Sequence, residues 1–150
     1  MLLPVLHAMK REPTALPGGT EVDGYRVDAV VGKGGSGAVY RATEVATGRT
    51  VAIKLLSPEL GEDAEWVERF RREAMSAATL KDPHVVEALD IGTVDGLPYL
   101  VFEFVEGRSL DGVIAAGALP ESQVVEIGLQ VSMGLLTAEP RAALARLALR

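Results

Sequence analysis

Hydrophobic and polar residues alternate along several short stretches of the chain, and this pattern predicts β-strands. Five strands are expected, at residues 25–31, 38–43, 50–56, 85–94 and 97–105. Between the third and the fourth, residues 62–80 repeat apolar side chains at steps of three and four, as on one face of a helix. Short turns join the first three strands, and Asp95-Gly96 joins the last two. The pattern therefore predicts an α+β fold, with an antiparallel sheet and one long inserted helix.

Two further helices are expected after the fifth strand. The first covers residues 108–117, with Ser109 as its N-cap. The second begins near Pro120-Glu121 and runs to about Leu136. No internal repeat is visible, so these helices extend a single domain.

The two ends of the chain differ from its middle. Residues 1–23 carry proline and glycine clusters and are expected to form a flexible tail, with order beginning near Tyr25. Residues 24–136 are expected to be one domain, which suits a chain of 150 residues. Residues 137–150 form a C-terminal tail in which eleven of fourteen residues are Ala, Leu or Arg.

Composition excludes several classes of function. Fifteen basic and 21 acidic residues give a net charge of −6, which argues against a broad nucleic-acid surface. The absence of cysteine excludes disulfides and thiolate chemistry, and His7 and His84 lie too far apart to indicate a metal site. No apolar run is long enough for a membrane helix, and the N-terminal run lacks the charge order of a secretory signal. We therefore expect a cytoplasmic protein without a membrane segment.

The segment 32–37, GKGGSG, contains the spacing Gly-x-Gly-x-x-Gly. In a dinucleotide-binding domain a helix follows the third glycine, and an acid lies about 20 residues further on. Here a strand pattern follows, and the segment at that distance carries Lys54 instead. The context favours a flap of two antiparallel strands, whose glycine turn presents backbone N–H groups to phosphate. A flexible hairpin turn without a ligand is the alternative that the glycines alone leave open.

The third strand contains Val-Ala-Ile-Lys, which favours the phosphate-binding flap over a hairpin turn without a ligand. Strand alternation places Ala52 and Lys54 on one side, where alanine leaves room for a flat base and the ammonium pairs with phosphate. Val39, two residues after the last glycine, covers the base from the same side. Glu73 on the predicted helix supplies a counter-ion for Lys54. Singly, Lys54 suits a solvated strand end and Glu73 a solvated helix surface, but their order and spacing together favour a nucleotide site.

In combination these segments resemble the N-terminal lobe of a protein kinase, most closely the bacterial serine/threonine kinases of eukaryotic type. The matching segments are GKGGSGAVY, VAIK, RFRREAMSAATL, DPHVV and PYLVFEFVEGRSL, and the resemblance covers about residues 24–136. It implies a five-stranded antiparallel sheet with one long helix, followed by a hinge and two helices of an incomplete C-terminal lobe. It also implies ATP as the bound nucleotide, and magnesium-dependent phosphoryl transfer to protein Ser or Thr in the intact family.

The resemblance assigns roles to individual residues. Lys54 would contact the α- and β-phosphates and Glu73 would hold Lys54, so these two are the expected catalytic residues. Val39 and Ala52 would form the roof over the adenine. The loop residues whose amides would cover the phosphates are Gly32, Lys33, Gly34, Gly35, Ser36 and Gly37.

The same resemblance identifies a hinge after the fifth strand. The carbonyl of Glu103 and the amide of Val105 would hydrogen-bond the adenine edge, and Phe102 takes the gatekeeper position. Either Ser109 or Asp111 would lie near the ribose. No metal ligand is expected in this chain.

Two motifs of the family are missing from these 150 residues. The catalytic loop, His-Arg-Asp with a following Asn, and the Asp-Phe-Gly segment do not occur. After Leu136 the family pattern stops abruptly, so we expect a truncated or frame-shifted product with negligible kinase activity of its own. A genuine amphipathic helical tail over residues 137–150 is the alternative.

Two classes of function therefore stay open. The chain is either an ATP-binding kinase lobe or a non-catalytic interaction module built on the same lobe. A continuous amphipathic helix through the tail would favour the module, whereas a tail without helical register would favour a frame change. The expected partners are ATP and an unidentified protein substrate, with no nucleic acid. The exposed lower face of the lobe is expected to promote self-association.

Overall fold

The computed structural model describes the backbone of residues 16–147, and their side chains except for Glu73 and residues 139–147. Its strands are β1 Glu21–Val22, β2 Tyr25–Gly34, β3 Gly37–Glu44, β4 Thr50–Leu56, β5 Ala88–Val94 and β6 Leu97–Glu103. Its helices are α1 Pro58–Gly61, α2 Ala64–Ala78, α3 Leu110–Ala115 and α4 Glu121–Leu147. None of these helices is long and apolar enough to span a membrane.

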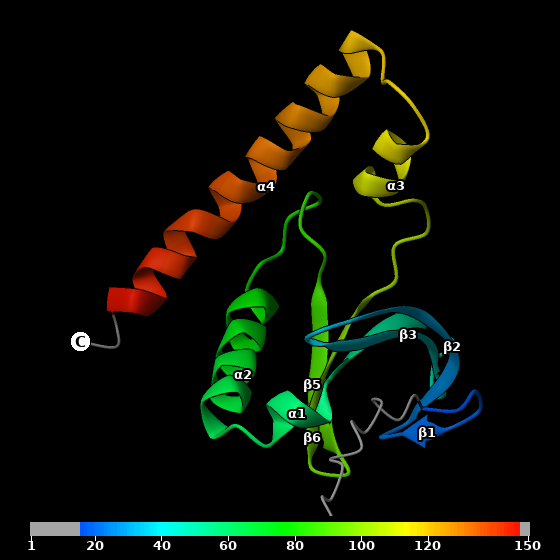
Figure 1. Ribbon diagram of the computed structural model, residues 1–150. Coiled ribbons are helices and arrows are strands. Elements are labelled where there is room, and N and C mark those ends of the chain that lie inside the picture. Colours follow the sequence, from blue (N-terminus) through cyan, green and yellow to red (C-terminus); the bar gives the residue numbers. More distant parts are fainter. Residues whose placement is uncertain (1–15, 148–150) are drawn as a thin grey trace, which may run out of the picture.

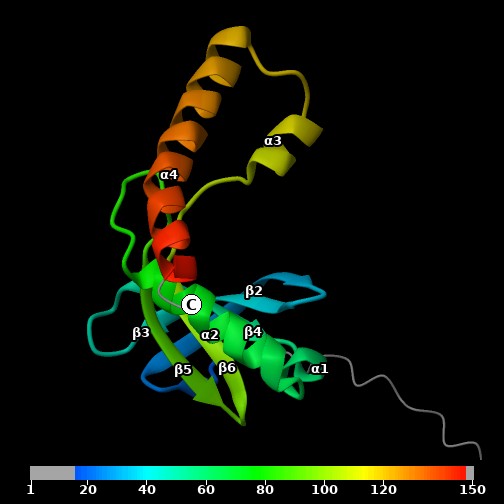
Figure 2. The same ribbon diagram turned by 90° about the vertical axis from the view of Figure 1, so that its left-hand side faces the viewer.

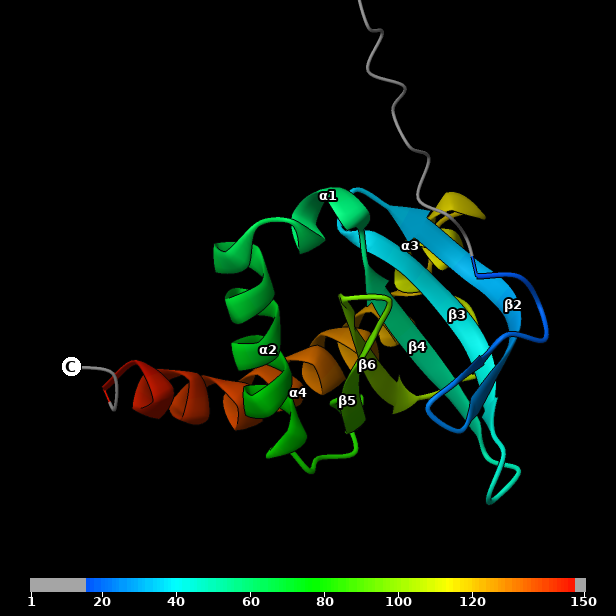
Figure 3. The same ribbon diagram turned by 90° about the horizontal axis from the view of Figure 1, so that it is seen from below.

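The strands form one curved antiparallel sheet in the order β1-β2-β3-β4-β6-β5 (Figures 1 and 3). The predicted fold class is confirmed, since a long helix follows the third long strand and two helices follow the sheet. α3 and α4 lie beyond the end of the sheet where the chain leaves β6, as Figures 1 and 2 show.

Alternation along the strands gives the sheet two different apolar faces. One face carries the larger cluster, made by Val22, Tyr25, Val27, Ala38, Tyr40, Ala42, Val51, Ile53, Leu55, Tyr99 and Val101. The other face carries a smaller cluster in which Phe70 and Ala74 of α2 pack on Leu56, Ala88 and Leu100. α2 therefore covers the β5–β6 side of this second face, which leaves the part over β3 and β4 for other contacts.

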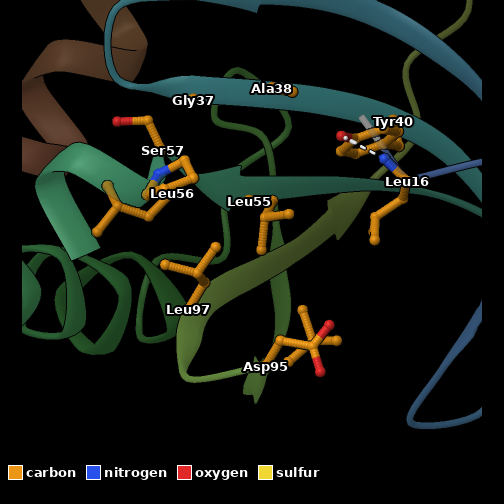
Figure 4. A pocket seen from close by; sticks show the side chains of 11 residues that line it. Leu16, Gly37, Ala38, Tyr40, Leu55, Leu56, Ser57, Asp95 and Leu97 are labelled. Atoms are coloured by element: carbon orange, nitrogen blue, oxygen red, sulfur yellow. Dashed lines mark hydrogen bonds between the residues drawn. The ribbon is translucent and has the colours of Figure 1, made fainter. Parts of the chain in front are cut away.

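An apolar cavity of about 270 Å³ opens on the side of the larger cluster (Figure 4). Leu16, Leu55 and Leu97 contribute to its wall, and the Leu16 amide donates a 3.1 Å hydrogen bond to the Tyr40 hydroxyl. Ala38 and Tyr40 also line it, and their cross-strand partners Leu55 and Ile53 belong to the same face. The cavity thus lies across the sheet from Lys54 and is separate from the predicted nucleotide face.

Several boundaries differ from the sequence predictions. β1 was not predicted, because two residues are too few to show alternation; it pairs with β2 through a turn at Asp23, whose φ is 47°. The predicted helix ending near Leu136 continues to Leu147, in keeping with the high helix propensity of the Ala- and Leu-rich sequence there. β5 begins at Ala88 rather than residue 85, because Asp82 and Val85 form a separate bridge.

α4 is fastened to the connection between α2 and β5. The Thr137 hydroxyl donates a 2.9 Å hydrogen bond to Asp82, whose other carboxylate oxygen accepts from the His84 amide at 2.8 Å. The amide of His84, followed by the Thr137 hydroxyl, lowers the pKa of Asp82. Gly134 makes this approach close, since a Cβ there would lie 3.0 Å from the His84 carbonyl oxygen.

Two tyrosines of the larger cluster bind carboxylates at the rim of the sheet. Tyr99 donates to Asp23 at 2.5 Å, and Tyr25 donates to Asp90 at 3.2 Å. Burial, followed by the charge of Asp90, raises the pKa of Tyr25 to about 12. These bonds tie the β1–β2 turn and the start of β2 to β5 and β6.

We predict that Tyr25 makes the fold sensitive to alkaline pH. Its folded pKa lies above the ordinary value of 10.0, so its contribution to stability is complete below pH 10 and is lost as the pH rises towards 12. The free energy of unfolding in urea should therefore fall more steeply between pH 9.5 and 12 for the wild type than for Tyr25→Phe. Parallel curves for the two proteins would contradict this prediction.

Candidate functional site

The glycine segment forms a tight hairpin between β2 and β3. Gly34 pairs with Gly37, so Gly35 and Ser36 are the two residues of the turn. The Ser36 carbonyl accepts a 3.2 Å hydrogen bond from the amide of Ser57, just beyond the end of β4. The hairpin is therefore held next to the strand that carries Lys54.

Space is open around the first glycines of this hairpin. A Cβ added at Gly32, Gly34 or Gly35 would meet no described atom within 4 Å. The amides of Gly35 and Ser36 donate no hydrogen bond to any described residue. The turn thus offers free N–H groups, which is the arrangement that binds phosphate oxygens.

Register places the predicted site residues of β3, β4 and β6 on one face. Val39 lies directly opposite Lys54, and Ala52 lies directly opposite Phe102. Because directly paired residues project to the same side of a sheet, and residues two apart on a strand do so too, all four share one face. Val39, Ala52, Lys54 and Phe102 are all half-buried. The structure thus brings together Val39, Ala52 and Lys54, which the sequence pattern placed on one side, and adds Phe102, which only the resemblance had singled out.

The expected ion pair between Lys54 and Glu73 is only partly described. Glu73 lies in α2, but its side chain is outside the described residues, so the pair stays a prediction. At 100° per residue Glu73 lies about 60° around α2 from Phe70, at the border of the stripe that packs on the sheet. Leu100, which belongs to the cluster under that stripe, lies opposite Lys54. Among the described carboxylates none forms an ion pair with Lys54.

The segment after β6 contains the predicted hinge positions. The Glu103 amide donates to the Glu87 carbonyl at 3.0 Å, and the Glu103 carboxylate accepts from the Glu87 amide at 3.0 Å. This pair of bonds anchors the end of β6 to the segment preceding β5. Val105 is 64% exposed, and its amide has no hydrogen-bond partner among the described residues.

The two candidates for a ribose contact have different surroundings. Ser109 caps α3, and its hydroxyl accepts a 3.1 Å hydrogen bond from the Gly112 amide. Asp111 lies exposed in the first turn of α3, and none of the described residues forms a hydrogen bond or an ion pair with its carboxylate. Ser109 therefore already serves the helix, whereas Asp111 is available to a ligand.

Sequence reasoning missed two residues at the rim of this face. The Arg41 guanidinium carbon lies 5.6 Å from the centre of the Phe104 ring, a cation–π distance. Arg41 pairs with Ala52 across β3 and β4, so it projects from the same face as Val39 and Lys54. The two-residue step from Val39 to Arg41 was a signal for this placement. Contact with Phe104 could not be inferred before the sheet order was known.

The described side chains of this face do not form a divalent-cation site. Among the described residues no three His, Cys, Asp or Glu side chains come together in a way that would hold a metal ion. The described residues therefore do not fit a magnesium site of their own, and Lys54 is the half-buried cation on this face.

Comparison with known proteins gives a consistent match. Residues 25–137 match the sequence profile described as protein kinase domain. The chain is 41% identical over 112 residues to a probable serine/threonine-protein kinase of Clostridium perfringens, covering 74% of this chain and 16% of that protein. It is 40% identical over 108 residues to the serine/threonine-protein kinase PrkC of Bacillus subtilis, covering 71% and 17%.

Solved structures agree with the sequence comparison. The PknI kinase domain of Mycobacterium tuberculosis superposes with a TM-score of 0.74 and 32% sequence identity, covering 85% of this chain and 52% of that one. The chain thus spans about half of that solved kinase domain, and less than a fifth of the two curated relatives described above.

We predict that Gly37, unlike Gly35, cannot be replaced by alanine. Gly37 has φ 139°, and a Cβ there would lie 1.9 Å from the Leu55 carbonyl oxygen, whereas Gly35 has open space and no positive φ. Gly37→Ala should lower the free energy of unfolding by more than about 2 kcal/mol, measured by urea denaturation. The matched control Gly35→Ala should change it by less than about 1 kcal/mol. Equal effects of the two substitutions would contradict the prediction.

Proposed function

The chain belongs to the protein kinase family, and from this premise we propose that it binds ATP on the sheet face that carries Val39, Ala52 and Lys54. The observation that carries the proposal is the register of β3 against β4. It sets Val39 directly opposite Lys54, and the glycine hairpin that precedes Val39 is hydrogen-bonded to Ser57, just beyond the end of the strand that carries Lys54.

The phosphates would lie between Lys54 and the hairpin. Lys54 supplies one positive charge from a half-buried position, where its attraction for an anion is less screened than on an open surface. The free amides of Gly35 and Ser36 supply donors, and the missing Cβ atoms of Gly34 and Gly35 permit close approach. Glu73 would orient Lys54 from α2.

The adenine would lie further along the same face, towards the end of β6. Val39 and Ala52 give it a small apolar roof, and Phe102 lies beside Ala52 on the neighbouring strand. The unpartnered amide of Val105 supplies a donor for the base edge, with the Glu103 carbonyl as the proposed acceptor. Asp111, whose carboxylate binds none of the described residues, is the available candidate for the ribose hydroxyls.

Transfer of the terminal phosphoryl group requires more than this face provides. Such reactions depend on in-line positioning of the acceptor and on neutralisation of charge developing on the phosphate. The 150 residues contain neither the His-Arg-Asp nor the Asp-Phe-Gly segment. We therefore propose that this polypeptide by itself holds ATP without transferring phosphate to protein Ser or Thr.

A non-catalytic interaction module is the second candidate, and the continuity of α4 is the observation in its favour. The helix runs without a break from Glu121 to Leu147, but the exposed apolar side chains of its described part lie all round it, so it lacks the single amphipathic face expected of such a module. Large apolar side chains on its described part, including Val125, Leu129 and Leu136, are exposed. If the folded protein bound no nucleotide, the interaction module would be the better explanation of this chain.

We predict that Lys54→Met weakens ATP binding at least about tenfold, because a hydrogen bond to a charged group contributes about 1.5–3 kcal/mol. Isothermal titration calorimetry with ATP and with adenosine would measure the effect. Adenosine affinity should stay unchanged, since Lys54 faces only the phosphates. Arg49→Ala removes an exposed cation from the β3–β4 turn, at the other end of these strands from the glycine hairpin, and should leave both affinities unchanged. Equal ATP affinity of Lys54→Met and wild type would refute the phosphate role.

A second prediction concerns phosphoryl transfer. The 150-residue polypeptide, incubated with radiolabelled ATP, magnesium and a generic protein substrate, should give no label above that of Lys54→Met. The missing acceptor-positioning groups are the physical reason. Labelling that disappears in Lys54→Met would show that the chain is catalytically competent alone.

A further inference from the structure

We propose that Arg41 is a positioning residue which, through its contact with Phe104, holds the hinge segment 103–105 at a fixed distance from the roof of the nucleotide face. The proposal rests on the proposed function, because it deepens the adenine side of that same site. Its physical basis is the 5.6 Å separation between the Arg41 guanidinium carbon and the Phe104 ring centre.

The sheet geometry explains how Arg41 reaches Phe104. β4 lies between β3 and β6, so the contact crosses two strand spacings, about 10 Å in all. Arg41, Ala52 and Phe102 form one row across the three strands. Ala52, in the middle of this row, is too small to separate the Arg41 guanidinium from the Phe104 ring, which lies just beyond the end of β6.

Phe104 is the residue whose restraint matters for the base. It lies between Glu103 and Val105, the two positions proposed to hydrogen-bond the adenine edge. Glu103 is anchored by two hydrogen bonds to Glu87, but none of the described backbone groups binds the Val105 amide. The Phe104 ring is half-buried against the Arg41 guanidinium. Among the described side chains, this contact links the segment that carries the Val105 amide to β3, on the opposite side of the face.

Two experimental outcomes distinguish a positioning role of Arg41 from a simple attraction between its charge and an anionic ligand. If Arg41 fixes the hinge, its loss weakens ligands that contain adenine and leaves inorganic triphosphate unaffected. If Arg41 acts by its charge, both ligands lose affinity together. The effect should also require the ring, so Arg41→Ala and Phe104→Leu should not be additive.

The test is calorimetric titration of ADP and of inorganic triphosphate into wild type, Arg41→Ala, Phe104→Leu and the double variant. We expect each single variant to bind ADP about two- to five-fold more weakly, the ratio that an exposed cation–π contact provides. The double variant should be no weaker than the single ones, and triphosphate affinity should stay constant. Arg49→Ala, which removes the same charge from the exposed β3–β4 turn, is the matched control and should behave as wild type.

A nucleotide-independent readout accompanies the titrations. The Arg41 Nε–H proton resonance should be shifted upfield by the Phe104 ring in the free protein and return to the ordinary arginine position in Phe104→Leu. Unchanged ADP affinity in Arg41→Ala, or an equal loss for triphosphate, would overturn the positioning role while leaving the proposed function intact. Failure of the wild type to bind ADP would instead overturn the proposed function, and the role of Arg41 with it.

Discussion

The pairing of β3 with β4 is the constraint on which the rest of the site depends. With Val39 opposite Lys54, the apolar roof and the cation face the same side, and the hairpin that precedes Val39 is carried to the end of β4. A shift of one residue would turn every side chain of one strand to the other face. Because Tyr40, Ala42, Val51 and Ile53 are all but fully buried on the opposite face, such a shift would expose core side chains, and the core therefore fixes the register.

The unequal covering of the two faces explains how one sheet serves both stability and binding. The larger cluster buries most of one face, apart from the cavity beside Leu16, and its burial is the main source of stability in a sheet of this size. The second face is only partly covered, because α2 packs over β5 and β6 and leaves β3 and β4 open. Half-buried Val39, Ala52 and Lys54 lie on the open part, where the proposed nucleotide would supply the contacts that a helix would otherwise make.

Sequence alone predicted the features that repeat along the chain. Five strands, the long helix and the common face of Val39, Ala52 and Lys54 follow from periodicities of two and 3.6, which local sequence encodes. β1 was missed because two residues carry no period, and its position depends on the distant bond between Asp23 and Tyr99. The contact of Arg41 with Phe104 joins residues 63 positions apart, so it appears only once β4 is known to lie between β3 and β6.

Nucleotide binding and phosphoryl transfer require different groups of a protein, and this difference explains which groups the proposed site contains. The groups proposed to hold a nucleotide are a roof, a hinge edge, a cation and amides that bind none of the described residues, and all of them lie between Gly32 and Val105. These groups derive from neighbouring strands and their turns, so folding of one sheet assembles them together. Transfer additionally needs groups on the far side of the phosphate, facing the acceptor. Since a single sheet face can contact only one side of a ligand, the sheet suits the proposed binding of ATP and cannot by itself enclose the nucleotide.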